Sequence, residues 1–504
     1  MRDNTKIEFG KWRSFLWPIH RWELKKFLPM FCMFFLIAFN YNSLRSYKDT
    51  MIVTAHEAGA EVIPFIKVWV VLPCAILFTI FFTALTNRFS REKVFYIMMS
   101  IFIAFFAIFT FVLLPAQDYL HPHEAADKLQ AALPEGVKGM IAIFRNWTFS
   151  LFYVMSELWS TAILSVLWWG FANEVTSVNE AKRYYGLLMM GSNVAGVIAG
   201  YAAVCFSGSL FYSWIPYGKN SWDQSILFLN VALIISGILT IVIYRWLNRN
   251  VIHPAEKINP STQEKQKTSL WENFKLLGKS KYLLCIAIIV LGYNLSMNLV
   301  EVIWKDQMLQ LYPDSNDYNR YMGHVTIAMS VLAAFSGLFL TSNLIRRYSW
   351  ARVALIPPVL ILVTGFAFLF FAIFQHTMGA FLGVAPLFLA VTLGSMQNIF
   401  SRASKYTLFD ATKEIAFIPL DPDMKLKGKA AIDGVGSRLG KSGGSVIHQG
   451  LLMIFGTLGG STPCVAAIFL GVILVWMFAV FALGKKFEAL VAKQNSEKVT
   501  ATSS

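Results

Sequence analysis

The feature that most limits the fold of this sequence is a series of long apolar runs, which recur from near one end of the chain to the other. Each run is about twenty residues long, which is enough for a helix to cross the hydrocarbon core of a bilayer. A backbone in lipid must satisfy its own hydrogen bonds, and these runs are too long and too uniformly apolar for barrel strands. The sequence therefore predicts an all-α membrane protein.

Composition agrees with this prediction. Hydrophobic residues make up 56% of the 504 residues and charged residues 14%, whereas a soluble chain carries about 25% charged residues. Secreted, nuclear and cytosolic soluble proteins are therefore excluded. The five cysteines are scattered through apolar stretches without the spacing of a zinc site or a disulfide framework, so we expect them to pack as small hydrophobic side chains. We predict no metal and no cofactor.

We predict twelve transmembrane helices in two groups of six, an arrangement like that of the major facilitator transporters. The first group covers residues 27–50, 58–84, 94–115, 146–172, 184–206 and 225–247. The second group covers residues 282–304, 320–344, 351–374, 378–400, 433–457 and 463–484. The predicted domains are an N-terminal half at 1–247, a polar cytoplasmic linker at 248–281 and a C-terminal half at 282–504.

The positive charge indicates how the chain is oriented. The net charge is +15, and most Lys and Arg residues lie in the two tails, the linker and the loops of one side. Because short cytoplasmic loops are enriched in these residues, we expect both termini in the cytoplasm. A nucleic-acid partner would need a basic soluble domain, which the sequence lacks, so none is predicted. On the opposite side, residues 117–144 are expected to form a small helix outside the membrane.

Short sequence echoes suggest that one half is a duplicate of the other. Tyr47-Lys48-Asp49 at the end of the first predicted helix resembles Trp304-Lys305-Asp306 at the end of the seventh. A second pair follows at nearly the same offset, and a third pair follows in the same order. By analogy of fold, a site is expected between the halves near the middle of the membrane.

Five ionisable residues fall inside predicted helices: Lys67, Glu157, Glu301, Arg438 and Lys441. A charge near the bilayer centre costs roughly 2.5 kcal/mol or more, so each should face a cavity or a partner. Lys67 lies about nine residues into its helix, roughly 14 Å along the axis, which places it near the midplane.

Polar residues accompany these charges at helical spacing. One face of the seventh helix carries Asn294, Asn298, Glu301 and Lys305, and one face of the fourth carries Ser150, Tyr153, Glu157 and Ser160. The eleventh helix repeats the pattern around its two cations. Three such faces can line one shared cavity.

Two interpretations of these charges stay open at this point. Lys67 with Glu157, and Glu301 with Lys441, can form structural ion pairs that hold helices together. Alternatively, the surplus of cations lines a cavity for a polyanion that carries a flat ring. The surplus cation favours the cavity.

Other motifs carry less weight. Gly440-Lys441-Ser442 lacks the preceding glycine and strand of a phosphate-binding loop, so an ATPase site is not predicted. His121 and His123 fit a metal site less well than a loop cap. The glycines at 191–200 and 434–444 have the spacing of closely packed helices.

Three segments carry a resemblance to a known family. Residues Asn40 to Thr50, Asn298 to Lys305 and Lys405 to Gly444 resemble the ATP/ADP translocase family of plastids and obligate intracellular bacteria, and the likeness extends over about residues 20–485. The resemblance implies exchange of ATP for ADP without hydrolysis. Very similar relatives instead import nucleoside triphosphates with protons or carry NAD, and these alternatives stay open. A sugar or drug carrier and a membrane enzyme are further alternatives.

The resemblance also implies four essential charged residues, which match Lys67, Glu157, Glu301 and Lys441 here. We expect Lys67 and Lys441, helped by Arg438, to hold the phosphates of ATP or ADP. The two glutamates would neutralise these lysines in the empty site, and Tyr153 would stack on the adenine. The N-terminus is poor in Ser, which favours the inner membrane of a bacterium over a plastid. We expect a monomer surrounded by lipid.

Overall fold

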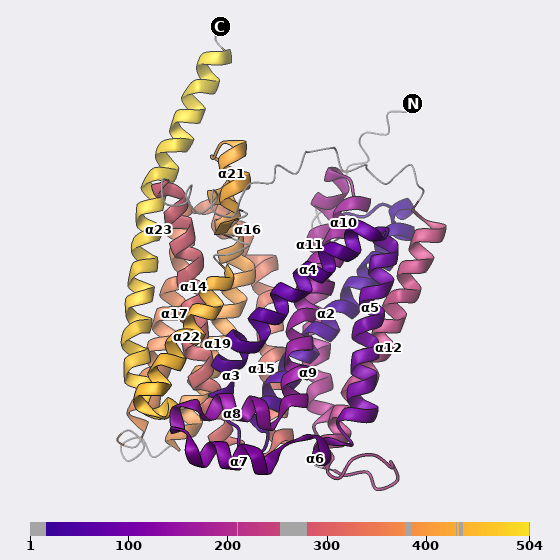
Figure 1. Cartoon of the computed structure of the whole chain (residues 1–504). Helices are drawn as coiled ribbons and strands as arrows, with labels where there is room; N and C mark the ends of the chain where they lie inside the picture. The colour runs from indigo at the N-terminus through magenta and orange to yellow at the C-terminus, as the bar shows by residue number, and fades with distance from the viewer. Residues whose placement is uncertain are drawn as a thin grey trace.

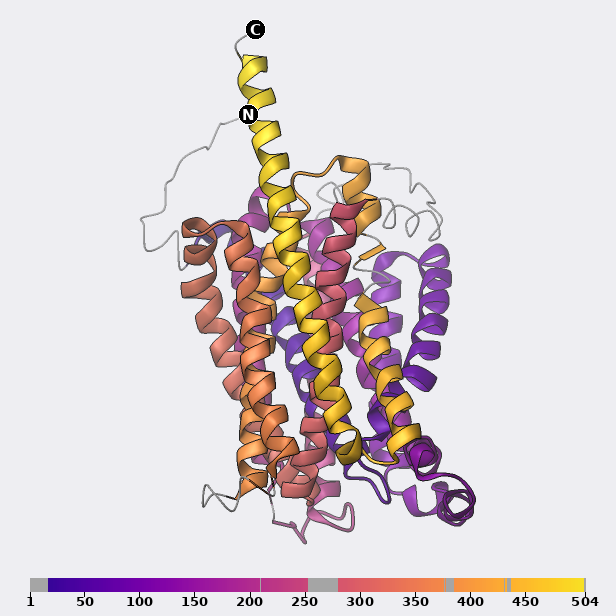
Figure 2. The ribbon, with the colours of Figure 1, turned by 90° about the vertical axis from the view of Figure 1, so that its left-hand side faces the viewer.

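The computed structural model describes residues 17–208, 210–252, 280–375, 377, 385–429, 431–432 and 437–502. Over these residues the chain is helical, and no β-strand occurs among them. The long helices stand side by side as a bundle (Figures 1 and 2). The start of α2 (Leu24–Val53) and the end of α23 (Leu458–Thr502) lie on one side, which we call the terminal side, and α7 (His123–Ala132) lies on the opposite side.

The described residues before the predicted linker, 17–252, form what we call the N-terminal part. Its first segment is η1 (Arg21–Glu23), which precedes α2. Apart from the elements of residues 117–145, which are described below, the helices that follow α2 are α3 (Val62–Ile66), η2 (Lys67–Val71), α4 (Leu72–Arg88), α5 (Arg91–Ile108), η3 (Phe109–Leu113), α9 (Trp147–Trp159), η5 (Ser160–Trp168), α10 (Trp169–Val175), α11 (Val178–Phe206) and α12 (Ser221–Asn250). The segments η2, η3 and η5 are π-helical turns within longer helices.

The described residues from 280 onward form what we call the C-terminal part. Its helices before α23 are α14 (Lys281–Leu311), α15 (Ser315–Phe335), η7 (Ser336–Leu340), α16 (Thr341–Arg347), α17 (Trp350–Ile373), α19 (Pro386–Ser404), η8 (Lys405–Phe409), α20 (Asp410–Ala416), α21 (Pro422–Lys429) and α22 (Ser437–Phe455). Most of the predicted linker, residues 253–279, lies outside the described residues.

Among the described residues, ten helical stretches are long and apolar enough to cross a membrane. They coincide with predicted helices one to nine and twelve. The segments predicted at 378–400 and 433–457 lie partly outside the described residues and contain α19 and α22, which are not among the ten. The all-α membrane fold is therefore confirmed, while the count of twelve stays a prediction.

Local sequence signals explain where several helices begin. The side chain of Ser177 accepts a hydrogen bond from the backbone N–H of Glu180 at the start of α11, and the Glu180 carboxylate accepts one from the N–H of Ser177. Asn220 and Asp314 cap α12 and α15 in the same manner. Each cap satisfies backbone donors that the first turn of a helix leaves without partners.

The two parts of the chain meet on the side opposite the termini. There α11 crosses α15 so closely that a Cβ on Gly200 would lie 2.7 Å from the carbonyl oxygen of Gly323. Thr54, just after α2, lies 2.7 Å from Ser315 at the start of α15, measured between their hydroxyl oxygens. These contacts confirm close helix packing at the glycines of 191–200, and we call this the closed side.

The outer segment 117–144 forms more than the single small helix that was expected. It contains α6 (Gln117–Leu120), α7, η4 (Glu135–Val137) and most of α8 (Lys138–Arg145). A Cβ on Gly139 would lie 2.5 Å from the carbonyl oxygen of Glu61, and one on Gly136 would lie 2.6 Å from that of Leu452. This segment therefore packs against both α3 and α22 and covers the closed side.

His121 makes the outer segment sensitive to acid. Its Nε2 atom lies 2.7 Å from the Thr148 hydroxyl, and burial, together with neighbouring His123, lowers the pKa of His121 from 6.5 to about 4. The unfolded chain then binds more protons than the folded one between pH 6.5 and about 4, so stability falls as pH drops through this window. We expect His121→Gln to flatten this fall, measured by thermal unfolding at a series of pH values. An unchanged pH profile would contradict the assignment.

Candidate functional site

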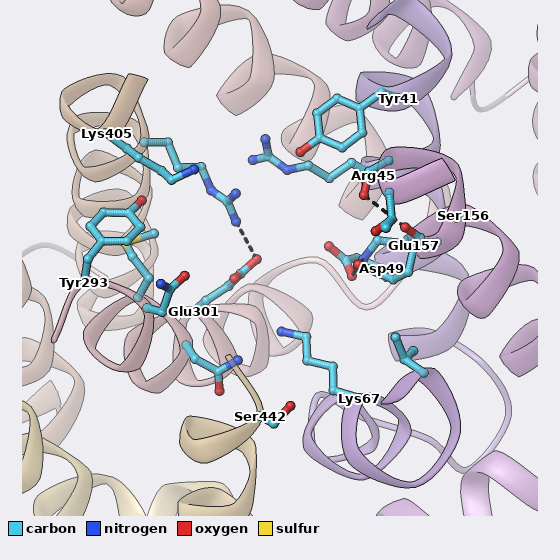
Figure 3. Close-up of a pocket in the computed structure, with 18 of the residues that line it drawn as sticks. Tyr41, Arg45, Asp49, Lys67, Ser156, Glu157, Tyr293, Glu301, Lys405 and Ser442 are labelled. Carbon is cyan, nitrogen blue, oxygen red and sulfur yellow. Dashed lines mark hydrogen bonds and ion pairs between the residues drawn. The ribbon is translucent and has the colours of Figure 1, made fainter. Parts of the chain in front are cut away.

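A cavity of about 520 Å³ lies between the two parts of the chain. Helices α2, α9 and η2 line it from the N-terminal part, and α14, α19 and η8 line it from the C-terminal part (Figure 3). Its charged side chains are Arg45, Lys48, Asp49, Lys67, Glu157, Glu301, Lys305, Arg402, Lys405, Asp410 and Lys413. Among the described residues the lining thus has seven basic and four acidic side chains, an excess of three positive charges.

Six of these side chains form one continuous series of ion pairs with alternating charge. From the N-terminal part to the C-terminal part the order is Glu157, Lys48, Asp49, Lys305, Glu301 and Arg402. The successive N···O distances are 3.0, 2.7, 2.7, 2.9 and 2.8 Å. We call this series the charge chain. It is neutral, so the excess positive charge of the cavity lies on other residues.

Tyr153 supports the charge chain from behind. It is fully buried, is not among the residues that line the cavity, and its ring lies under the ammonium group of Lys48, 4.0 Å from the ring centroid. The π-electrons of a tyrosine ring attract a cation placed in this way. Tyr153 therefore positions Lys48, and in this conformation its ring is not available to stack on a nucleotide base.

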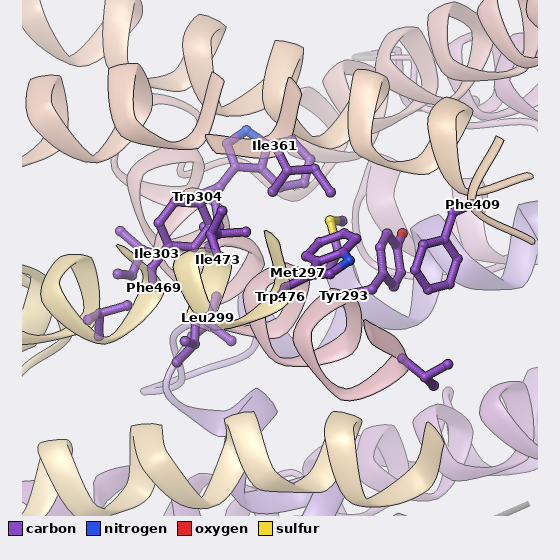
Figure 4. Packing of buried hydrophobic residues seen from close by; sticks show 14 of the residues in the cluster. Tyr293, Met297, Leu299, Ile303, Trp304, Ile361, Phe409, Phe469, Ile473 and Trp476 are labelled. Carbon is purple, nitrogen blue, oxygen red and sulfur yellow. The ribbon is translucent and has the colours of Figure 1, made fainter. Parts of the chain in front are cut away.

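The other end of the charge chain is held by the packing of α14. Trp304 of α14 and Trp476 of α23 pack into the same hydrophobic core (Figure 4), and the Trp304 indole N–H donates to the Ser395 hydroxyl at 3.1 Å. A Cβ on Gly292 would lie 2.9 Å from that of Trp476, so only glycine allows this approach. This packing fixes the face of α14 that carries Glu301.

Asn294 and Asn298 join α14 to α22 and also line the cavity. A Cβ on Gly440 would lie 2.7 Å from the Cβ of Asn294, and one on Gly444 would lie 2.8 Å from that of Asn298. The Ser445 hydroxyl donates to the Oδ1 atom of Asn298 at 3.4 Å. The glycines of α22 therefore permit close packing against the polar face of α14.

Lys67 and Arg45 supply positive charge that the charge chain does not neutralise. Both extend toward the cavity (Figure 3). Within the part of the chain that the structure describes, neither has a carboxylate oxygen within 4.0 Å. Lys67 begins the π-helical turn η2, and Lys405 begins another, η8. Such turns widen a helix locally and are frequent at functional sites.

The structure brings together five of the predicted site residues. Lys67, Glu157, Glu301, Asn294 and Asn298 all line the cavity, whereas Tyr153 does not. The predicted structural pair of Lys67 with Glu157 is not formed, because Glu157 binds Lys48. The side chains of Arg438 and Lys441 lie outside the described residues, although Ser442 beside them lines the cavity.

Sequence reasoning missed Lys48, Asp49 and Arg402, and it placed Lys305 on the polar face of the seventh helix without assigning it a partner. Lys48 and Asp49 lie in the repeated Lys-Asp segments, which the sequence identified only as evidence of duplication. In the structure, side-chain exposure is 7% for Lys48, 2% for Asp49 and 1% for Lys305. No sequence pattern indicated that Arg402 belongs to the site, because a single Arg near a helix end is typical of a loop at the membrane surface.

No group of three or more His, Cys, Asp or Glu side chains that could hold a metal occurs among the described residues. The excess positive charge, together with the aromatic rings of Tyr41, Tyr293, Tyr406 and Phe409, suits an organic anion.

Residues 2–487 match the family described as the TLC ATP/ADP transporter. The chain belongs to the ATP/ADP transporter family. It is 46% identical over 504 residues to ADP,ATP carrier protein 1 of Chlamydia trachomatis serovar D, with 99% of this chain and 95% of that protein covered. It is 42% identical over 478 residues to the chloroplastic ADP,ATP carrier protein 1 of Arabidopsis thaliana, with 94% and 76% covered.

The fold of this ATP/ADP transporter family member is similar to that of a protein of solved structure. A crystal structure of a bacterial homologue of the iron transporter ferroportin, in an inward-facing state, has a TM-score of 0.55 and 14% sequence identity. The similarity covers 92% of this chain and 100% of that one. At this identity the likeness supports the architecture of the chain and nothing about its substrate.

Proposed function

We propose that the chain is an antiporter that exchanges ATP for ADP across a membrane by alternating access and so imports ATP. The observation that carries this proposal is a cavity with excess positive charge between the two parts of a chain in the ATP/ADP transporter family. Phosphate groups form strong charge-assisted hydrogen bonds to lysine and arginine, which offset the loss of water. The cavity contributes binding and no hydrolysis, so the protein acts as a carrier and not as an enzyme.

Lys67 and Arg45 are the phosphate ligands that we propose in the N-terminal part. Lys441, helped by Arg438, stays our proposal for the C-terminal part on the strength of the family resemblance. Tyr406, which is 46% exposed and lines the cavity, replaces Tyr153 as our candidate for stacking on the adenine. A base can stack only on a ring with an accessible face.

Glu157 and Glu301 have a different proposed role from the one expected. They do not form ion pairs with Lys67 and instead hold Lys48, Lys305 and Arg402 in the charge chain. Release of either carboxylate to carry a proton would break ion pairs of 2.8 to 3.0 Å, so neither is well placed for proton coupling. This observation favours exchange over proton-coupled import.

We further propose that the carrier is a monomer in the inner membrane of a bacterium, with both termini in the cytoplasm. The closed side then faces outward, and we propose that the cavity opens toward the cytoplasm. ATP from outside would enter after the closed side opens and the terminal side closes.

Preloading tests exchange directly. Proteoliposomes that contain the purified protein and internal ADP should take up labelled ATP at least tenfold faster than empty ones. A proton uncoupler should leave the initial rate unchanged. Equal uptake with and without internal ADP would overturn the antiport proposal, and a strong effect of the uncoupler would favour proton-coupled import.

A further inference from the structure

We propose that the ion pair between Asp49 and Lys305 is a latch: it keeps the closed side shut while the cavity is empty, and the phosphates of a bound nucleotide release it. This inference rests on the proposed function and adds the step that makes transport depend on substrate. It concerns two residues to which the family resemblance assigned no role, although helical spacing placed Lys305 on the polar face of the seventh helix.

The position of this ion pair sets it apart from the others. The Nζ atom of Lys305 lies 2.7 Å from the Oδ2 atom of Asp49, and both side chains are almost fully buried. It is the one ion pair that joins the N-terminal and C-terminal parts among the described residues. Both residues also line the cavity, where a bound anion can reach them.

The neighbours of Asp49 tie it to the closed side. Ser46 lies 3.4 Å from Thr326 and the Thr50 hydroxyl donates to Asn319 at 3.2 Å, so α2 is bound to α15 on both sides of Asp49. Alternating access requires these contacts to open. Because Asp49 and Lys305 belong to opposite parts, separation of the closed side must also pull this ion pair apart.

The charges left behind explain why an empty carrier resists this step. Separation divides the charge chain into two groups of three. Glu157, Lys48 and Asp49 carry one excess negative charge, and Lys305, Glu301 and Arg402 carry one excess positive charge. Pulling these two opposite net charges apart in a largely buried site is unfavourable, although Asp49 and Lys305 each keep one partner in their own group.

A bound nucleotide compensates the excess positive charge of the group formed by Lys305, Glu301 and Arg402. A phosphate beside Lys305 takes the place of Asp49, while Asp49 keeps Lys48 as its partner at 2.7 Å. Slow return of the empty carrier, which is what makes transport an exchange, then follows from the latch.

A cross-link across the closed side measures the latch without any transport. Thr54 and Ser315 have hydroxyl oxygens 2.7 Å apart, so cysteines at these positions can form a disulfide when the side is shut. In the full-length protein without nucleotide, the pair Thr54→Cys and Ser315→Cys should cross-link rapidly under mild oxidant. Adding Asp49→Asn should slow cross-linking at least fivefold, and saturating ATP should slow it in the chain that retains Asp49. An unchanged rate after Asp49→Asn overturns the latch.

Transport gives the second readout. In proteoliposomes, Asp49→Asn, Lys305→Gln and the double variant should each lower the ratio of ATP uptake with and without internal ADP at least fivefold. Because all three remove the same ion pair, the double variant should show no greater loss than the single ones. Glu180→Gln is the matched control, since it removes an ion pair to Lys26 of 3.0 Å within the N-terminal part alone, and it should keep the ratio.

The outcomes separate the latch from the proposed function. If the unaltered protein shows no effect of internal ADP, exchange is wrong, and cross-linking of the empty protein still tests the latch. If exchange is present and the Asp49 and Lys305 variants lose affinity or total uptake with an unchanged ratio, the pair is a binding or folding element and the latch is wrong.

Discussion

Replacing Lys67 with Gln is expected to weaken ATP binding by about ten- to a hundredfold. Lys67 reaches the cavity without a carboxylate partner within 4.0 Å among the described residues, so its whole charge is available to a phosphate. A hydrogen bond to a charged group contributes about 1.5 to 3 kcal/mol, and each 1.4 kcal/mol corresponds to about a factor of ten in affinity. Calorimetric titration of the purified protein with ATP measures the change.

The controls for Lys67 separate charge from folding. Lys67→Arg keeps the charge and should retain much of the affinity, although its planar head places the donors differently. Lys26→Gln removes a lysine that is paired with Glu180 and does not line the cavity, so it should bind ATP as the unaltered protein does. Affinity within twofold of normal for Lys67→Gln would show that the phosphates are held elsewhere.

Replacing Glu301 with Gln is expected to cause the largest loss of stability at the site. Its Oε1 atom accepts from Arg402 at 2.8 Å and lies 2.9 Å from the ammonium of Lys305. Lys305 keeps Asp49 as a partner, but Arg402 has no other carboxylate within 4.0 Å among the described residues. Removing one member of a buried ion pair costs about 3 to 5 kcal/mol, because the remaining charge is left without compensation.

Thermal unfolding in detergent measures this loss. The double variant Glu301→Gln with Arg402→Gln removes the uncompensated cation and should recover a large part of the stability. Glu180→Gln should cost clearly less than Glu301→Gln, because Glu180 holds one cation, Lys26, whereas Glu301 holds both Lys305 and Arg402. If Glu301→Gln unfolds at the same temperature as the unaltered protein, the end of the charge chain is not the structural element that we describe.

The acidic residues of the site show how far reasoning from the sequence extends. A charge within an apolar run is visible in the sequence, and the cost of placing it in lipid predicts that it faces a cavity, as Glu157 and Glu301 do. The sequence did not show which residue forms an ion pair with each of these carboxylates. Glu157 binds Lys48, more than a hundred residues earlier in the chain, and no local pattern encodes that distance.

For Tyr153 the sequence predicted a place in the cavity that the structure does not give it. Helical spacing placed it on the same face as Glu157, and the structure places it one layer behind the cavity, under Lys48. Spacing along a helix defines a direction only to within a broad sector. Whether a side chain in that sector reaches the cavity depends on which side chains of the neighbouring helix lie between it and the cavity.

The sequence by itself determined that this chain is a bundle of membrane helices and that Lys67, Glu157 and Glu301 face a common interior, because hydropathy and the cost of buried charge act on each segment separately. The tertiary structure alone decided which charges become partners and which stay available for an anion. Ion pairing depends on distances of about 3 Å between helices that are far apart in the chain, and only the packing of glycine and aromatic residues sets those distances.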